Sequence, residues 1–131
     1  MIFFKTNTAT TAQWSLLIYT VCIVAIFILA YVGLMPTKLH AIPFYDFAGH
    51  FILYGGWGFC FGWRFSKPLI VILGFKIYNG ILIAIAIATA EEFLQQLSPW
   101  RTFSLIDIFW GIFGIAAACI LLNFNEKKLQ L

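Results

Sequence analysis

The chain has 131 residues, of which 63% are hydrophobic and 10% are charged, and its mean hydropathy is +0.96. Soluble domains are about 45–50% apolar and about 25% charged, so this composition excludes a soluble catalytic domain. The net charge of +3 gives no basis for nucleic-acid binding. A membrane-spanning helix needs about 20 apolar residues. Residues 1–131 are therefore expected to form one all-α transmembrane domain, a four-helix bundle.

The uncharged runs predict four membrane spans. No charge lies between Lys5 and Lys38, and the apolar run that follows Trp14 is closed by Met35 and Pro36. This run is too long for the apolar region of a secretory signal, so we interpret it as an uncleaved anchor. The four spans are expected at residues 15–35, 47–65, 75–97 and 106–124.

The start of the third span is set by its length. A helix from Pro68 to Leu97 would be about 45 Å long at 1.5 Å per residue, against a hydrocarbon layer of about 30 Å. We therefore expect Lys76 to lie near the interface with its stem snorkelling, and residues 66–75 to form an interfacial stretch or a tilted extension. No strand is expected, because open sheet edges are excluded from lipid and the alternation of a transmembrane barrel is missing.

The basic residues predict the orientation. With four spans, both termini and the second loop share one side of the membrane, which then holds Lys5, Arg64, Lys67, Lys76, Lys127 and Lys128. The other side has Lys38 and Arg101. The positive-inside bias therefore places both termini in the cytoplasm, and the expected location is the bacterial cytoplasmic membrane.

The remaining polar residues gather at the outward ends of the predicted helices. Three of them follow one another at helical spacing at the start of the second span, and the others lie at the end of the third span, in the short third loop and at the start of the fourth span. The candidate ligand-binding residues are Asp46, His50, Tyr54, Glu92, Gln95, Arg101 and Asp107.

Each of these residues also has a purely structural interpretation. Asp46 and Asp107 can cap helix N-termini, where a carboxylate is favourable. Arg101 can clamp Glu92 or Asp107, and His50 can be a hydrogen-bonded core residue. Capping alone does not require an arginine, a histidine and a third carboxylate on the same side of the membrane, and charged groups at this depth usually have a partner or a function.

At these positions the chain resembles the VanZ-like family of small integral membrane proteins. The family pattern is Asp-Lys-x-x-His-Phe-x-x-Tyr in one helix, then Glu-x-x-Gln, Pro-x-Arg and Asp-x-x-x-Asn-x-x-Gly across the last hairpin. The matching residues are Asp46, His50, Phe51, Tyr54, Glu92, Gln95, Pro99, Arg101, Asp107 and Gly114. Phe47 stands where the family usually has Lys, and Gly111 where it usually has Asn, so chemistry that depends on those two residues is altered or lost here.

The resemblance implies more about fold than about activity. The founding member of the family is linked to resistance to the glycopeptide antibiotic teicoplanin, and most relatives have no assigned activity. That role is not transferred to this chain. It agrees with an outward-facing site, since cell-wall lipids and glycopeptides lie on that side of the membrane.

Small residues predict how the helices pack. In lipid, glycine and alanine let helix backbones approach closely, so we expect the second and fourth helices to pack together. The residues expected at this contact are Gly58, Gly62, Gly111, Gly114 and Ala118. Cys22, Cys60 and Cys119 lie inside the predicted spans and are interpreted as small apolar residues.

Three functions fit this pattern. The first is binding of a lipid headgroup or a lipid-linked cell-envelope ligand at the outward polar cluster. The second is a structural or accessory subunit of a larger membrane complex. The third, an intramembrane acid–base or metal-dependent enzyme, is less favoured, because no nucleophile or metal-binding motif has a recognisable spacing. We expect no cofactor and no resident metal. The expected partners are membrane lipids or other membrane subunits.

Overall fold

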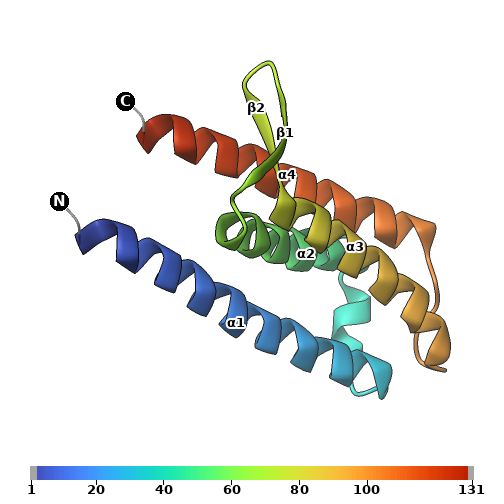
Figure 1. Ribbon diagram of the computed structural model, residues 1–131. Coiled ribbons are helices and arrows are strands. Elements are labelled where there is room, and N and C mark those ends of the chain that lie inside the picture. Colours follow the sequence, from blue (N-terminus) through green and yellow to red (C-terminus); the bar gives the residue numbers. More distant parts are fainter. Residues whose placement is uncertain (1–2, 130–131) are drawn as a thin grey trace.

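The computed structural model describes residues 3–129, so the first two and last two residues of the expected domain lie outside the described part. The described chain is mostly helical (Figure 1). Its elements are α1 (Phe3–Tyr31), the 3-10 helix η1 (Thr37–Ala41), α2 (Tyr45–Arg64), β1 (Pro68–Ile72), β2 (Phe75–Tyr78), α3 (Asn79–Leu94), the 3-10 helix η2 (Gln95–Leu97) and α4 (Leu105–Leu129). The helices alternate in direction, so that α1 begins and α4 ends at the same end of the bundle.

The helices carry apolar side chains on their outer faces. Ile18 and Val21 of α1 and Phe109 and Leu121 of α4 are all exposed, a surface that water would not favour and lipid would. Among the described residues, three helical segments are long and apolar enough to cross a membrane, namely Thr8–Tyr31, Asn79–Leu97 and Leu105–Glu126. The chain therefore has the helices of a membrane protein.

Helix α2 differs from the other three. It is not among the segments that are apolar enough to cross a membrane, because it contains several glycines as well as Asp46, His50 and Arg64. Instead it contacts each of the other helices. Its inward face carries His50, Tyr54, Trp57, Gly58, Cys60 and Gly62, all buried. The second of the four expected spans thus packs against all three other helices, and these six residues face protein, whereas Asp46 and Arg64 are exposed.

The contact between α2 and α4 is made at glycines. A Cβ on Gly55 would lie 3.1 Å from the carbonyl oxygen of Gly114, and a Cβ on Gly114 would overlap the carbonyl oxygen of Phe51. Further along, Gly58 faces Ile115, whose Cγ2 would be 3.0 Å from an added Cβ. Backbone therefore lies against backbone here, as in small-residue helix contacts in lipid.

Helix α1 ends earlier than expected. We expected the first span to end at residue 35, but the helix stops at Tyr31 because Gly33 adopts a left-handed φ of 74°. The Leu34 N–H then donates to the Leu29 carbonyl at 2.8 Å and the Gly33 N–H to the Ala30 carbonyl at 3.3 Å. These two bonds form a Schellman motif, which ends the helix before the chain reaches Pro36.

Side-chain hydrogen bonds at three residues of α1 attach it to the rest of the bundle. Near its middle, the Tyr19 hydroxyl donates to the Leu53 carbonyl at 3.0 Å, and Trp57 Nε1 donates to Thr20 Oγ1 at 3.0 Å. At its end, the Tyr31 hydroxyl donates to Glu91 Oε1 at 3.1 Å. The part of α1 between these tethers forms one wall of a groove described below.

The expectation of an all-helical chain is wrong at one place. Residues 68–78, expected as an interfacial stretch and the start of the third span, form an antiparallel hairpin that projects from the bundle (Figure 1). The run Leu69–Ile72 is rich in β-branched residues, and the two-residue turn places Leu73 at φ 50° and Gly74 at φ 80°, as a type I′ turn requires. Helix α3 therefore begins at Asn79.

The hairpin is fastened to α4 at Lys76. Asn123 Oδ1 accepts the Lys76 N–H at 2.8 Å, and Asn123 Nδ2 donates to the Lys76 carbonyl at 2.8 Å. Lys76 Nζ lies 2.6 Å from Glu126 Oε2, so this lysine pairs with a carboxylate of α4, a partner that the expected snorkelling did not include.

Candidate functional site

Polar side chains from all four helices meet at the end of the bundle where α1 and α3 finish and where α2 and α4 begin. Most of them are buried: the exposed fraction is 8% for Glu91, 1% for Glu92, 1% for Gln95 and 8% for His50. Buried carboxylates are costly unless they are hydrogen-bonded or paired, so the partners of each group define the site.

Glu91 is the centre of the hydrogen-bond network. Its Oε1 accepts from the Tyr31 hydroxyl of α1 at 3.1 Å, and its Oε2 accepts from the Tyr54 hydroxyl of α2 in a short bond. Oε2 also accepts from Gln95 Nε2 at 2.9 Å. One carboxylate therefore connects α1, α2 and α3.

Gln95 links the two glutamates to Arg101. Its Nε2 donates to Glu91 Oε2 at 2.9 Å and to Glu92 Oε2 at 3.0 Å, so both amide hydrogens are used. Its Oε1 accepts from Arg101 Nε at 3.2 Å. The amide thus separates the guanidinium from both carboxylates. The two ion pairs found within 4 Å in the described part of the chain, His50–Asp107 and Lys76–Glu126, do not include Arg101. The clamp of Arg101 on Glu92 or Asp107, its purely structural interpretation, is therefore absent from the described residues.

Asp107 does not cap α4, because Ser104 does. The Ser104 hydroxyl oxygen accepts the Asp107 N–H at 3.3 Å, and the Ser104 N–H donates to Glu92 Oε1 at 2.8 Å. In a capping box the carboxylate of the third helical residue would take that second bond. Here Glu92 of α3 takes it, and the Asp107 carboxylate faces His50, with Oδ2 3.7 Å from Nε2.

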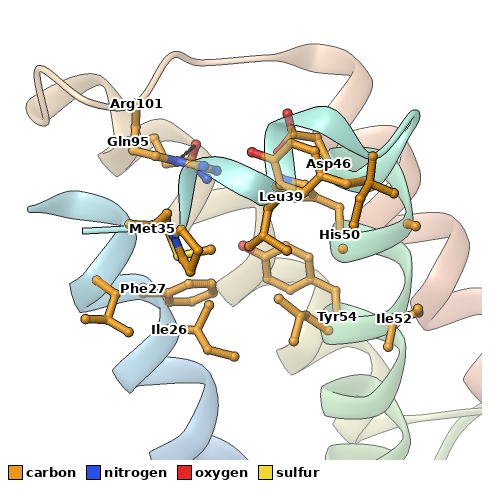
Figure 2. Close-up of a pocket in the computed structure, with 18 residues that line it drawn as sticks. Ile26, Phe27, Met35, Leu39, Asp46, His50, Ile52, Tyr54, Gln95 and Arg101 are labelled. Carbon is orange, nitrogen blue, oxygen red and sulfur yellow. Dashed lines mark hydrogen bonds between the residues drawn. The ribbon is translucent and has the colours of Figure 1, made fainter. Parts of the chain in front are cut away.

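A groove of about 620 Å³ opens beside this network, between α1 and the first half of α2. Figure 2 shows Ile26 and Phe27 of α1 facing His50 and Tyr54 of α2 across the groove, with Arg101 and Gln95 at one end. Its walls are mainly apolar. The polar residues that line it are Tyr45, Asp46, His50, Tyr54, Gln95 and Arg101.

The third loop, between η2 and α4, closes the end of the groove. Ser98 Oγ donates to the Tyr31 carbonyl at 2.8 Å and accepts from the Trp100 N–H at 3.2 Å. The Trp100 ring covers Gly33, where an added Cβ would lie 2.7 Å from Cδ2. The loop that carries Arg101 is therefore fixed to the end of α1.

The structure places the seven candidate residues in three groups. Gln95 and Arg101 stand at the groove end, joined by a hydrogen bond, with Asp46 exposed at the same rim. Tyr54 lines the groove and donates to Glu91. The third group, His50, Glu92 and Asp107, offers three potential metal-ligand atoms that all lie within 4.8 Å of one another.

The residues expected at helix contacts are also accounted for. An added Cβ on Gly62 would lie 2.5 Å from Leu122 Cδ1, and one on Gly111 would lie 3.0 Å from Tyr54 Cδ2. Ala118 is 3% exposed. Gly111 thus makes room for the Tyr54 ring that reaches Glu91.

Three important residues were missing from the expected site: Glu91, Tyr31 and Ser104. Glu91 stands next to Glu92 and four residues before Gln95, a spacing that places Glu91 and Gln95 on one helical face. That spacing was the available signal. Nothing in the sequence links Tyr31, sixty positions away, to this face.

Comparison with protein-family models, with curated proteins and with solved structures finds no match. The resemblance to the VanZ-like family therefore stays a prediction from the motif residues, and the function has to be inferred from the geometry of the site.

Proposed function

We propose that this chain is a VanZ-like integral membrane protein that binds an anionic lipid headgroup, or the phosphate of a lipid-linked cell-envelope ligand, at the polar end of the groove. In this proposal all four helices cross the bacterial cytoplasmic membrane, both termini are cytoplasmic, and the groove end with Arg101 faces outward. The bias of Lys and Arg towards the other end of the bundle supports this orientation.

The position of Arg101 is the observation that carries the proposal. The guanidinium is half-buried at the end of an apolar groove, and Gln95 holds it through Nε. Guanidinium groups bind phosphate and carboxylate through several N–H donors at once. Because Gln95 accepts from Nε, the two terminal nitrogens of Arg101 can bind an anion that enters the groove.

The groove fits the apolar part of such a ligand. Its volume of about 620 Å³ is within the range of about 300–1,000 Å³ that is typical of small-molecule sites. Apolar walls with a few polar groups at one end suit an amphipathic molecule, whose chain would lie against Phe27 and Leu53. Asp46 at the rim can accept hydrogen bonds from headgroup hydroxyls.

The test is lipid retention by the purified full-length chain. The protein is incubated in detergent with equal amounts of phosphatidylglycerol and phosphatidylcholine, and bound lipid is counted by native mass spectrometry. We expect preferential retention of phosphatidylglycerol, reduced at least tenfold by Arg101→Ala. The matched control is Arg64→Ala, since Arg64 lies at the far end of α2 and stacks on Phe65. Equal retention by the wild type and Arg101→Ala would show that this proposal is wrong.

A second pair of variants tests the groove without changing any charge. Ala48→Phe places a ring in the groove, whereas Ala116→Phe places the same ring on the exposed surface of α4. We expect Ala48→Phe to lose lipid and Ala116→Phe to retain it. If the two variants retain equal amounts, the ligand does not occupy the groove.

The hairpin favours one alternative function, an accessory subunit of a membrane complex. All five residues of β1 are exposed, and Leu73 at the tip is fully exposed. Such an apolar hairpin is suited to contact another protein. Under this alternative, Leu73→Asp would release a partner that co-purifies with the wild type after mild solubilisation, and lipid retention would stay unchanged.

A further inference from the structure

His50, Glu92 and Asp107 come from three different helices and converge on one point. His50 lies in α2, Glu92 in α3 and Asp107 in α4, and one ligand atom from each lies within 4.8 Å of the other two. The three residues are far apart along the chain, and the fold brings them together. Their proximity results from the glycine contact between α2 and α4.

The imidazole of His50 lacks the hydrogen bonds that a buried histidine normally makes. The residue is 8% exposed, and Nδ1 has no hydrogen-bond partner. Nε2 points at Asp107, but the distance of 3.7 Å to Oδ2 is longer than a hydrogen bond. A buried polar group in this condition usually has a ligand or another explanation.

The surroundings of His50 hold more carboxyl groups than cationic side chains. Glu91 and Glu92 are buried and Asp107 is half-buried, while the nearest cationic side chain, Arg101, is bonded to Gln95 and pairs with none of them within 4 Å. Buried carboxylates are usually paired with cations or coordinate metals. A cation between Glu92 and Asp107 would compensate this charge.

We propose that His50, Glu92 and Asp107 bind one divalent first-row transition ion, with Zn²⁺ as the probe. An imidazole ligand favours such ions over Mg²⁺ and Ca²⁺, which prefer oxygen alone. Three protein ligands leave one position for water, as in sites where zinc is reactive. His50 also lines the groove, but Arg101 is not among the ligands of the ion, and this proposal does not depend on the binding of an anion there.

The distances are compatible with this ion. Zn–N and Zn–O bonds of about 2.0–2.2 Å place neighbouring ligands of a tetrahedral site about 3.3–3.6 Å apart. The separation of 3.7 Å between His50 and Asp107 is close to this range, and the largest separation in the group, within 4.8 Å, requires side-chain movements of about 1 Å.

Hydrogen bonds already orient one of the carboxylates. Glu92 Oε1 accepts from the Ser104 N–H, and Oε2 accepts from Gln95, so the group is held by both oxygens while each keeps a second lone pair. Outer partners of this kind fix metal ligands in place and are part of a metal site.

The first measurement is metal binding by the full-length chain. The protein is purified in detergent with an affinity tag that contains no histidine, treated with a chelator, and titrated with Zn²⁺, and bound zinc is quantified by elemental analysis. We expect one Zn²⁺ per chain. His50→Gln and Asp107→Asn should each weaken binding at least tenfold. Glu126→Gln, which removes an acid at the opposite end of α4, should bind as the wild type does.

A second measurement uses only the wild type and therefore does not depend on how the variants fold. X-ray absorption of the zinc-loaded protein should show nitrogen and oxygen ligands at about 2.0–2.2 Å and no sulfur at about 2.3 Å. Sulfur ligation would assign the ion to the cysteines and overturn the proposal. It would also be overturned by the absence of stoichiometric zinc, or by folded His50→Gln and Asp107→Asn proteins that bind zinc as tightly as the wild type.

Discussion

Gly114 of α4 lies directly against the backbone carbonyl of Phe51 in α2, so that even a methyl group at this position would overlap the carbonyl oxygen. Because this oxygen belongs to the backbone, it cannot move away as the end of a flexible side chain could. The contact holds α2 and α4 close enough for His50 and Asp107 to face each other.

Gly114→Ala should therefore destabilise the protein. We expect a loss of about 1–3 kcal/mol, the usual cost of overpacking, measured by thermal unfolding in detergent. Gly49→Ala is the matched control, since Gly49 is also in a helix and an added Cβ there meets nothing within 4 Å. That change should be neutral or stabilising by up to about 1 kcal/mol. Equal stability of the two variants would mean that α2 and α4 are not in backbone contact.

Glu91→Gln should also destabilise the bundle. The carboxylate accepts hydrogen bonds from Tyr31, Tyr54 and Gln95. In glutamine an NH₂ group replaces one of the two oxygens, and this group donates hydrogen bonds and cannot accept those made at that position. Hydrogen bonds to charged groups contribute about 1.5–3 kcal/mol, so a loss of at least about 2 kcal/mol is expected. Glu126→Gln removes a half-exposed ion pair and should cost under about 1 kcal/mol. Comparable losses for the two glutamates would argue against a central role of Glu91.

Gly33→Ala tests the junction between α1 and the third loop. The left-handed φ of 74° costs a non-glycine residue about 1–2 kcal/mol, and the added methyl would also displace the Trp100 ring. Gly74→Ala has a similar φ of 80° but open space around it, so it isolates the backbone cost. We expect Gly33→Ala to be the less stable of the two and to shift the tryptophan fluorescence. Identical unfolding temperatures would contradict the packing of Trp100 on Gly33.

Asn123→Leu should release the hairpin while leaving the helices intact. Without the Asn123 side chain, the Lys76 N–H loses its partner, and the Lys76 carbonyl keeps only the weak donor Cys119 Sγ at 3.4 Å. Amide hydrogen exchange in β2 should then become faster. Asn125→Leu, at an exposed position of the same helix, should leave exchange in β2 unchanged. A hairpin that is equally protected in both variants would mean that Asn123 does not hold it.

One physical rule allows both the helices and the position of the polar cluster to be predicted from the sequence. Charge is excluded from long apolar runs in lipid, so the residues at the ends of those runs, such as Asp46, Glu92 and Asp107, mark one end of the bundle. This required no knowledge of how the helices pack.

Pairing between the helices could not be predicted in the same way. The rotation of each helix about its axis decides which glutamate accepts the hydrogen bond of Tyr54. It also decides that Ser104, and not Asp107, caps α4. The hairpin was missed because a short apolar run such as Leu69–Ile72 fits a strand or a helix equally well by hydrophobicity. The left-handed turn at Leu73 and Gly74 decides between them.

The tethers of α1 also limit what the groove can enclose. Trp57 holds α1 at Thr20, and Glu91 holds it at Tyr31, eleven positions further along. At 1.5 Å per residue, the wall between these two points is about 16 Å long. The spacing of these two hydrogen bonds thus sets the length of hydrocarbon chain that the groove can enclose. A longer tail would have to leave the protein past Thr20. The protein would then select its ligand by the length of the hydrocarbon chain.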